Sequence, residues 1–216
     1  VMAMWKLGAA LATGCTVVLK PAEQTPLSAL YLAELIEEAG FPAGVVNIVP
    51  GFGKTAGQPL VDHPLVDKIA FTGSTDVGKA IMSRASKTMK RLTLELGGKS
   101  PNIILPDADL TQAIPAALSG VMFNQGQVCS AGSRVFIHKK QYDNVISDMV
   151  DRAKKIKLGP GIQADTEMGP LVSAEQQKRV LGYIEKGVDE GAELVVGGGK
   201  AYEEGYFVSP TVFANV

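Results

Sequence analysis

The stretch FNQGQVCSAGSR, from Phe123 to Arg134, places one of the chain's two cysteines among small and amide side chains. Gly126 and Gly132 lie within three residues of Cys129 on either side, so the sequence offers little bulk to bury the sulfur. An accessible thiolate can act as a nucleophile. No histidine stands nearby to form a protease-like pair. Cys129 is therefore a candidate nucleophile, and backbone N–H groups beside it could stabilise an oxyanion.

Glu95 is a second candidate for chemistry. It lies between Leu94 and Leu96 in the stretch LELGGKSP, at the expected end of a strand. A carboxylate in apolar surroundings can have its pKa raised toward neutrality. We expect such surroundings for Glu95. The adjacent Gly97 would let the backbone approach a ligand closely.

The stretch GFGKTAG, residues 51–57, contains a Gly-Lys pair that invites comparison with phosphate-binding loops. A Walker loop needs a glycine where Ile48 stands, so that motif is excluded. A dinucleotide fingerprint fits poorly as well, because its third glycine would come one residue late. A turn between a strand and a helix is the alternative.

The stretch FTGSTDVG, residues 71–78, is better placed to bind a phosphate. Gly73 ends an expected strand, and Ser74 and Thr75 begin an expected helix. The free N–H groups and the dipole of a helix N-terminus attract anions. Simple N-capping by Ser74 or Thr75 is the alternative.

Composition excludes several classes of protein. The chain has 216 residues, 46% of them hydrophobic and 20% charged, which is enough for one or two globular domains. Its net charge of −1 gives no electrostatic basis for binding nucleic acid or an anionic membrane surface. No apolar run reaches the roughly 18–20 residues that span a bilayer. The chain does not begin with a signal-peptide pattern, and we expect a cytoplasmic protein.

The small number of cysteines and histidines also excludes some kinds of site. Two cysteines are too few for a disulfide framework and fit a reducing compartment. We expect Cys15, which precedes the apolar run TVVL, to be a small buried hydrophobic residue. His63 and His138 are far apart in the sequence, so we expect no metal site.

Strands alternate with helices in the first half of the chain. The apolar runs CTVVLK, GVVNIVPG, DKIAFTG and KRLTLELGG predict strands, and they are separated by helical patterns. The first helix should end at Gly14. The second, TPLSALYLAELIEEAG, should begin with Thr25 as N-cap and Pro26 as first residue, present one apolar face and end at Gly40; its face comprises Leu27, Leu30, Tyr31 and Leu35.

Continuously apolar strands separated by helices are typical of a parallel sheet covered on both faces. We therefore predict an α/β fold with a Rossmann-like parallel sheet over residues 1–97, followed from residue 98 to 216 by the first part of a second α/β domain. In that part we expect helices at about 110–123, 141–156 and 174–190, a strand at 134–138, and two further strands near the end.

Four segments together resemble the NAD(P)-dependent aldehyde dehydrogenase superfamily. They are VLKPAEQTP, FTGST, LELGGKSP and FNQGQVCSAGSR, in the family's order and approximate spacing, and the resemblance covers essentially the whole chain. The last two segments are highly specific. The chain most resembles the broad-range aldehyde and betaine-aldehyde branch.

The resemblance implies a role for each candidate residue. Cys129 resembles the family nucleophile, and Glu95 resembles the general base that activates the hydrolytic water. Lys20 and Glu23 resemble the contacts to the adenosine ribose, where the Glu23 carboxylate would repel a 2′-phosphate, so we expect NAD in preference to NADP. Further cofactor contacts are expected at Gly53, Gly73, Ser74 and Gly97.

The same resemblance implies an incomplete cofactor domain over residues 1–97 and an incomplete catalytic domain over residues 98–216. The family's oxyanion-hole asparagine would precede Val1, and its Glu-Ile-Phe-Gly-Pro motif would follow Val216. We therefore expect the 216 residues alone to be inactive. The full-length protein is expected to be a homo-oligomer, a dimer or a tetramer, that oxidises a small aldehyde.

Two other functions fit some of these observations. A thiol esterase could use Cys129 and Glu95 without a cofactor. A non-catalytic interaction module would keep the fold, but would not need both of those residues.

Overall fold

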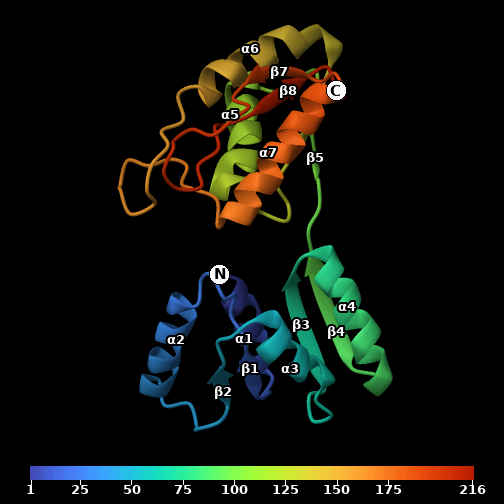
Figure 1. Ribbon diagram of the computed structural model, residues 1–216, viewed down its shortest axis with the longest axis vertical. Coiled ribbons are helices and arrows are strands. Elements are labelled where there is room, and N and C mark those ends of the chain that lie inside the picture. The colour runs from blue at the N-terminus through green and yellow to red at the C-terminus, as the bar shows by residue number, and fades with distance from the viewer. The chain divides into compact units, whose positions relative to one another are not determined.

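Short parallel strands and the helices that connect them build the first unit, Val1–Gly97, of the computed structural model, which describes all residues from Val1 to Val216 (Figure 1). Its elements are α1 (Met2–Ala12), β1 (Val17–Leu19), α2 (Leu27–Glu38), β2 (Val46–Ile48), a π-helical turn (Gly53–Gly57), α3 (Gln58–Asp62), β3 (Lys68–Gly73), α4 (Thr75–Ala85) and β4 (Arg91–Leu96). Strands β1 and β2 pair in parallel, as do β3 and β4. The predicted alternation and parallel direction are confirmed.

The strands of this unit do not form one continuous sheet. They form two separate two-stranded sheets, β1–β2 and β3–β4. Apolar composition indicates that a strand is covered, and its position between helices indicates a parallel direction, but neither identifies the strand beside it. Few apolar side chains are buried in this unit; they are Leu7, Ala29, Val61, Ile81 and Ala85.

Glycines end the first two helices as expected. Gly14 and Gly40 have φ of +75° and +79°, the left-handed conformation that glycine adopts without a steric penalty. The predicted cap of α2 is wrong, because Thr25 lies in a turn in which its N–H donates to Ala22 O (3.2 Å). Pro26 takes the N-cap position instead, and no side chain caps the helix.

Two apolar features of this unit are exposed, and the exposure of Cys15 contradicts the predicted burial. The shared face of α2 is exposed; its residues are Leu27, Leu30, Tyr31 and Leu35. Helical spacing shows which side chains share a face but not what covers them. Cys15 is exposed as well, because it lies in the turn after Gly14 and outside β1, with its Sγ 3.6 Å from Thr13 Oγ1.

The second unit, Gly98–Val216, packs helices against two small sheets. Its elements are β5 (Pro101–Ile104), α5 (Leu110–Met122), a 3₁₀ turn (Phe123–Gly126), β6 (Arg134–Ile137), a second 3₁₀ turn (Lys139–Gln141), α6 (Tyr142–Ala153), α7 (Ala174–Asp189), β7 (Glu193–Val196) and β8 (Val212–Ala214). Strands β5 and β6 are parallel, whereas β7 and β8 are antiparallel. The helices predicted here are confirmed to within a few residues at their ends.

The main core of this unit lies between α5, α6 and the β5–β6 sheet; its buried residues are Ile104, Ile114, Ala117, Leu118, Val145, Met149 and Ala153. A smaller cluster under α7 contains Leu171, Ile184 and Val208. Both clusters support segments that reach the cysteine loop. Among all the helices, none combines the length and the hydropathy needed to cross a bilayer.

Candidate active site

Cys129 lies in the loop between the 3₁₀ turn Phe123–Gly126 and strand β6, and its side chain is exposed. Helix α5 leads into this loop. The Asp109 carboxylate caps α5 by accepting from the Thr111 N–H (2.9 Å), and Ile114 and Leu118 anchor the helix in the core. The loop that carries the thiol therefore begins at the end of a firmly packed helix.

The backbone reverses just before the cysteine through three consecutive left-handed residues. Asn124 and Gln125 have φ of 50° and 56°, and Gly126 has φ of 73°. A non-glycine residue in this region is uncommon and costs free energy. Bonds within the turn hold it: Gln127 N donates to Asn124 O (3.0 Å), and Asn124 Nδ2 donates to Gln127 O (3.2 Å).

Two consecutive backbone amides at the cysteine have no hydrogen-bond acceptor. Ala131 N donates to Val128 O (3.1 Å) and closes the turn over the cysteine. The N–H groups of Cys129 and Ser130 have no acceptor within the chain. Two free donors beside a thiol can stabilise an oxyanion at a carbonyl that the sulfur attacks.

The two most specific sequence motifs meet in this unit. Arg134, at the end of the cysteine stretch, donates from Nε to Lys99 O (2.8 Å) and from its backbone N–H to Ser100 O (3.3 Å). A Cβ added to Gly98 would lie 3.4 Å from Cys129 O, so the two backbones are in contact. The residues that follow LELG are thus fixed beside the cysteine loop.

Glu95 lies near the end of β4, in the first unit. Half-buried and exposed residues alternate along this strand, and Glu95 lies on the exposed side, opposite Leu94 and Leu96. The apolar surroundings expected for its carboxylate are therefore absent from this unit, because the strand's leucines all point to the other face.

A lysine that the sequence did not single out lies close to this strand pair. Lys6 of α1 donates from Nζ to Thr72 Oγ1 (2.6 Å), and Thr72 is the register partner of Glu95 across β3 and β4. The only signal in the sequence was a single cation in an otherwise apolar helix. The contact joins residues 66 positions apart, and no local pattern predicts such a contact.

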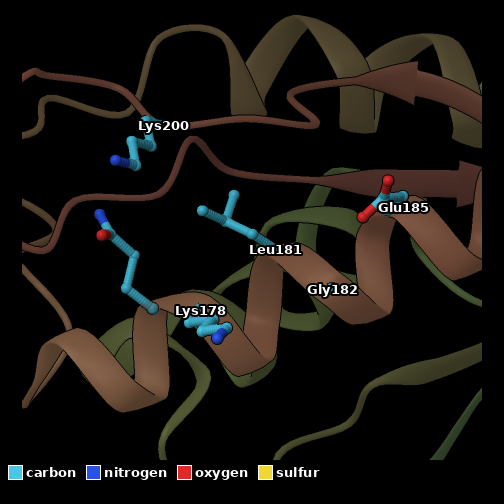
Figure 2. Close-up of a pocket in the computed structure, with 6 residues that line it drawn as sticks. Lys178, Leu181, Gly182, Glu185 and Lys200 are labelled. Carbon is cyan, nitrogen blue, oxygen red and sulfur yellow. The ribbon is translucent and has the colours of Figure 1, made fainter.

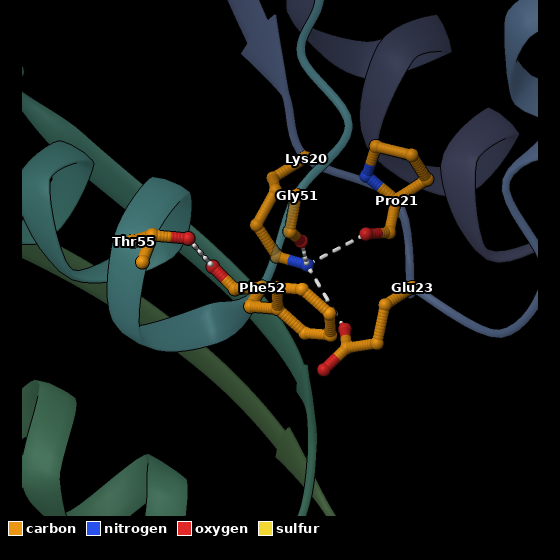
Figure 3. A network of polar contacts seen from close by, with 6 residues as sticks. All are labelled: Lys20, Pro21, Glu23, Gly51, Phe52 and Thr55. Carbon is orange, nitrogen blue, oxygen red and sulfur yellow. Dashed lines mark hydrogen bonds and ion pairs between the residues drawn. The ribbon is translucent and has the colours of Figure 1, made fainter.

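Lys20 joins the carboxyl ends of β1 and β2 (Figure 3). Its ammonium donates to Pro21 O (2.6 Å), to Gly51 O (3.1 Å) and to the Glu23 carboxylate (3.3 Å). An ammonium has three hydrogens, so these three acceptors satisfy it fully. The structure thus brings Lys20 and Glu23 together as an ion pair beside the loop that contains Gly53.

The Glu23 carboxylate has a lowered pKa. A hydrogen bond from its own backbone N–H, assisted by the Lys20 ammonium, holds the pKa of this carboxyl below its usual value against a smaller opposing effect of desolvation. Its side chain keeps 37% of its surface exposed, so solvent screens the pair. A negative charge therefore stands at this position at neutral pH.

The glycine loop after β2 follows the alternative that the sequence left open, a turn between strand and helix. Gly51 has φ of +145°, and a Cβ there would lie 2.9 Å from Ala56 Cβ, so this position requires glycine. Gly53 begins the π-helical turn, and a Cβ there would meet no atom within 4 Å. The space beside Gly53 is open to a ligand.

Ser74 caps α4 by accepting from the Val77 N–H (3.3 Å). The amides of Thr75 and Asp76 have no acceptor in the chain and point out of the helix N-terminus. Packing explains the glycine at position 73, because a Cβ there would lie 2.4 Å from the Phe71 ring. Gly73 pairs in register with Leu96, so Ser74 and Gly97 follow neighbouring strand ends.

An open groove of 380 Å³ lies elsewhere, along α7 in the second unit (Figure 2). Lys178, Leu181 and Glu185 line it from the helix, and Lys200 lines it from the facing segment. It contains no cysteine and none of the predicted site residues. The chemistry-bearing residues lie on exposed loops and strand ends, and we do not assign a function to this groove.

Comparisons with known proteins cover the whole chain. A family model described as "Aldehyde dehydrogenase family" matches residues 1–216. DhaS of Bacillus subtilis (strain 168), named as a candidate aldehyde dehydrogenase, is 71% identical over 215 residues, which are 100% of this chain and 43% of that protein. The chain therefore spans less than half the length of the curated relatives it matches.

Solved structures give the same result. The NAD+ complex of an aldehyde dehydrogenase from Bacillus cereus superposes with a TM-score of 0.98 at 62% identity, over 100% of this chain and 44% of that one. Betaine aldehyde dehydrogenase from Staphylococcus aureus, also in complex with NAD+, superposes with a TM-score of 0.95 at 45% identity, over 99% of this chain and 43% of that one.

Proposed function

Because the chain belongs to the aldehyde dehydrogenase family, as the four motifs predicted, we propose that the full-length protein oxidises an aldehyde to the carboxylate with NAD and water. The observation that carries the proposal is the exposed Cys129 thiol with unpaired amides beside it. The fold, the motifs and the structural relatives, which are aldehyde dehydrogenases in complex with NAD+, support the same reaction.

The first unit offers groups that suit a dinucleotide. Glu23, oriented after the end of β1 by the Lys20 ammonium, supplies carboxylate acceptors that suit the two hydroxyls of a ribose. The open space at Gly53 leaves room for the adenosine. The free amides at the start of α4, next to Ser74, would bind the pyrophosphate. The Glu23 charge favours NAD over NADP, because it would repel a 2′-phosphate.

The chemistry begins at Cys129. Its thiolate adds to the aldehyde carbon and forms a thiohemiacetal, and the N–H groups of Cys129 and Ser130 stabilise the negative oxygen that develops. NAD, when bound, accepts the hydride that leaves this carbon. Loss of the hydride converts the adduct into a thioester of Cys129.

Glu95 completes the cycle as general base. It takes a proton from a water molecule, the hydroxide adds to the thioester carbon, and the carboxylic acid leaves as the Cys129 thiolate is restored. The net reaction consumes aldehyde, NAD+ and water and yields carboxylate, NADH and two protons.

The test uses the full-length protein. With NAD and a panel of short aldehydes we expect NADH to form, and a Cys129→Ala variant should bind NAD and form none. Hydrolysis of an activated ester that needs no NAD, with no NADH from any aldehyde, would contradict the proposal and favour the esterase. The homo-oligomer that the resemblance implies belongs to the same proposal, and light scattering on the purified protein tests it.

A further inference from the structure

The turn before Cys129 needs support from outside itself. Asn124 and Gln125 are left-handed without being glycine, and such residues persist only where the surroundings fix them. The bonds within the turn tie Asn124 to Gln127 but connect it to no other part of the unit. A second segment of the chain must therefore fix where the turn lies.

Two glutamines link this turn to the segment Gly169–Val172. Gln127 Oε1 accepts a hydrogen bond from the Val172 N–H (3.2 Å). The Gln125 carboxamide satisfies both its groups when its oxygen accepts from the Gly169 N–H (3.0 Å) and its nitrogen donates to Asn124 O (3.0 Å). Both glutamines are half-buried, whereas the neighbouring Cys129 is exposed.

The segment that they contact is itself held firmly. Leu171 is buried in the cluster with Ile184 and Val208, and its N–H donates to Tyr206 O (3.0 Å). Gly169 approaches so closely that a Cβ there would lie 3.3 Å from the end of the Gln125 carboxamide. The segment therefore provides a rigid surface against which the cysteine turn is fixed.

On the premise of the function proposed above, we propose that Gln127 is a positioning residue for the nucleophile: its bond to Val172 N–H sets the direction of the Cys129 thiol and of the free amides beside it. Only Val128 separates Gln127 from Cys129. A rotation of the turn would move the sulfur and the oxyanion donors together. Small displacements at a reacting centre can reduce the rate by about 10²-fold.

Two variants separate this role from a general loss of structure. Gln127→Met keeps the length of the side chain but cannot accept a hydrogen bond, whereas Gln127→Glu keeps an acceptor for the Val172 N–H. Gln112→Met, on the exposed face of α5, is the matched control. All are made in the full-length protein, and the NADH burst rate, the Kd for NAD and deuterium uptake by residues 123–131 are measured.

We expect Gln127→Met to slow the burst by about 10²-fold, to raise deuterium uptake in the cysteine turn and to leave the Kd for NAD within about twofold. Gln127→Glu should recover most of the burst rate, and Gln112→Met should match the wild type. A normal burst and normal uptake in Gln127→Met would overturn the proposal, as would a Gln127→Glu variant as slow as Gln127→Met. If the wild type makes no NADH, the proposed function fails, and unchanged uptake in Gln127→Met would still overturn the positioning role.

Discussion

Replacing Glu23 by glutamine should shift the protein's cofactor preference from NAD toward NADP. The substitution keeps the shape of the side chain and removes the negative charge that the Lys20 ammonium orients (Figure 3). That charge is present at neutral pH, because the pKa of the carboxyl lies below its usual range. Without this charge, the site no longer repels the 2′-phosphate of NADP, so it should discriminate less against NADP.

The size of the effect follows from the exposure of the site. With 37% of its side-chain surface exposed, Glu23 interacts through a medium close to water. Two unit charges about 4 Å apart then repel by about 1 kcal/mol, and a 2′-phosphate carries between one and two charges. The positive charge of Lys20 offsets part of this repulsion. We therefore expect the removal of the Glu23 charge to favour NADP by about 1.4 kcal/mol, which is a tenfold change in the ratio of kcat/KM for NADP to that for NAD.

The assay measures this ratio in the full-length protein, with Glu38→Gln at the far end of α2 as the control. The difference should shrink in 1 M salt, where the Debye length is about 3 Å. In the wild type, the preference for NAD over NADP that Glu23 causes should persist as the pH falls. It should disappear only below the lowered pKa of Glu23, where the carboxyl is protonated. An unchanged ratio, or an equal change in Glu38→Gln, would refute a contact between Glu23 and the ribose.

Two other predictions rest on single residues. Ser74→Ala should lower the free energy of unfolding by about 1 kcal/mol, because it removes the cap of α4, and thermal unfolding measures this loss. Ser74→Asp should keep the cap but weaken NAD binding, because its charge repels the pyrophosphate; tight binding in an NAD titration would exclude a phosphate at this site. Because Cys15 and Cys129 are both exposed, iodoacetamide should label both, but activity should fall only as Cys129 is labelled. The Cys15→Ala variant should stay active and should still be inactivated by iodoacetamide. A Cys15→Ala variant that iodoacetamide does not inactivate would contradict the assignment of the nucleophile.

Local chemistry made several features predictable from the sequence. Gly14 and Gly40 end helices because few other residues adopt a positive φ readily, and Ser74 caps α4 because its hydroxyl reaches a free amide in the first turn. The family motifs predicted the candidate residues themselves. The two motifs around Gly98 and Cys129 are in contact, which their separation in the sequence does not reveal.

Features that depend on distant partners could not be predicted in this way. Lys6 reaches Thr72, and Gln127 reaches Val172, across 66 and 45 positions respectively. No periodicity or turn signal encodes such a pair. The exposure of Cys15 was missed for a related reason, since an apolar run indicates a strand but not the residue at which the strand begins.

The central claim is that Cys129 carries the acyl group during aldehyde oxidation, and intact-mass spectrometry of the full-length protein tests it most directly. In a Glu95→Gln variant, the loss of the base should slow thioester hydrolysis by about 10²–10⁴-fold, so mixing with NAD and an aldehyde should produce one burst of NADH and a protein heavier by one acyl group. Peptide mapping should place that group on Cys129. Continued NADH turnover without any adduct, or an acyl group on Cys15, would contradict the account.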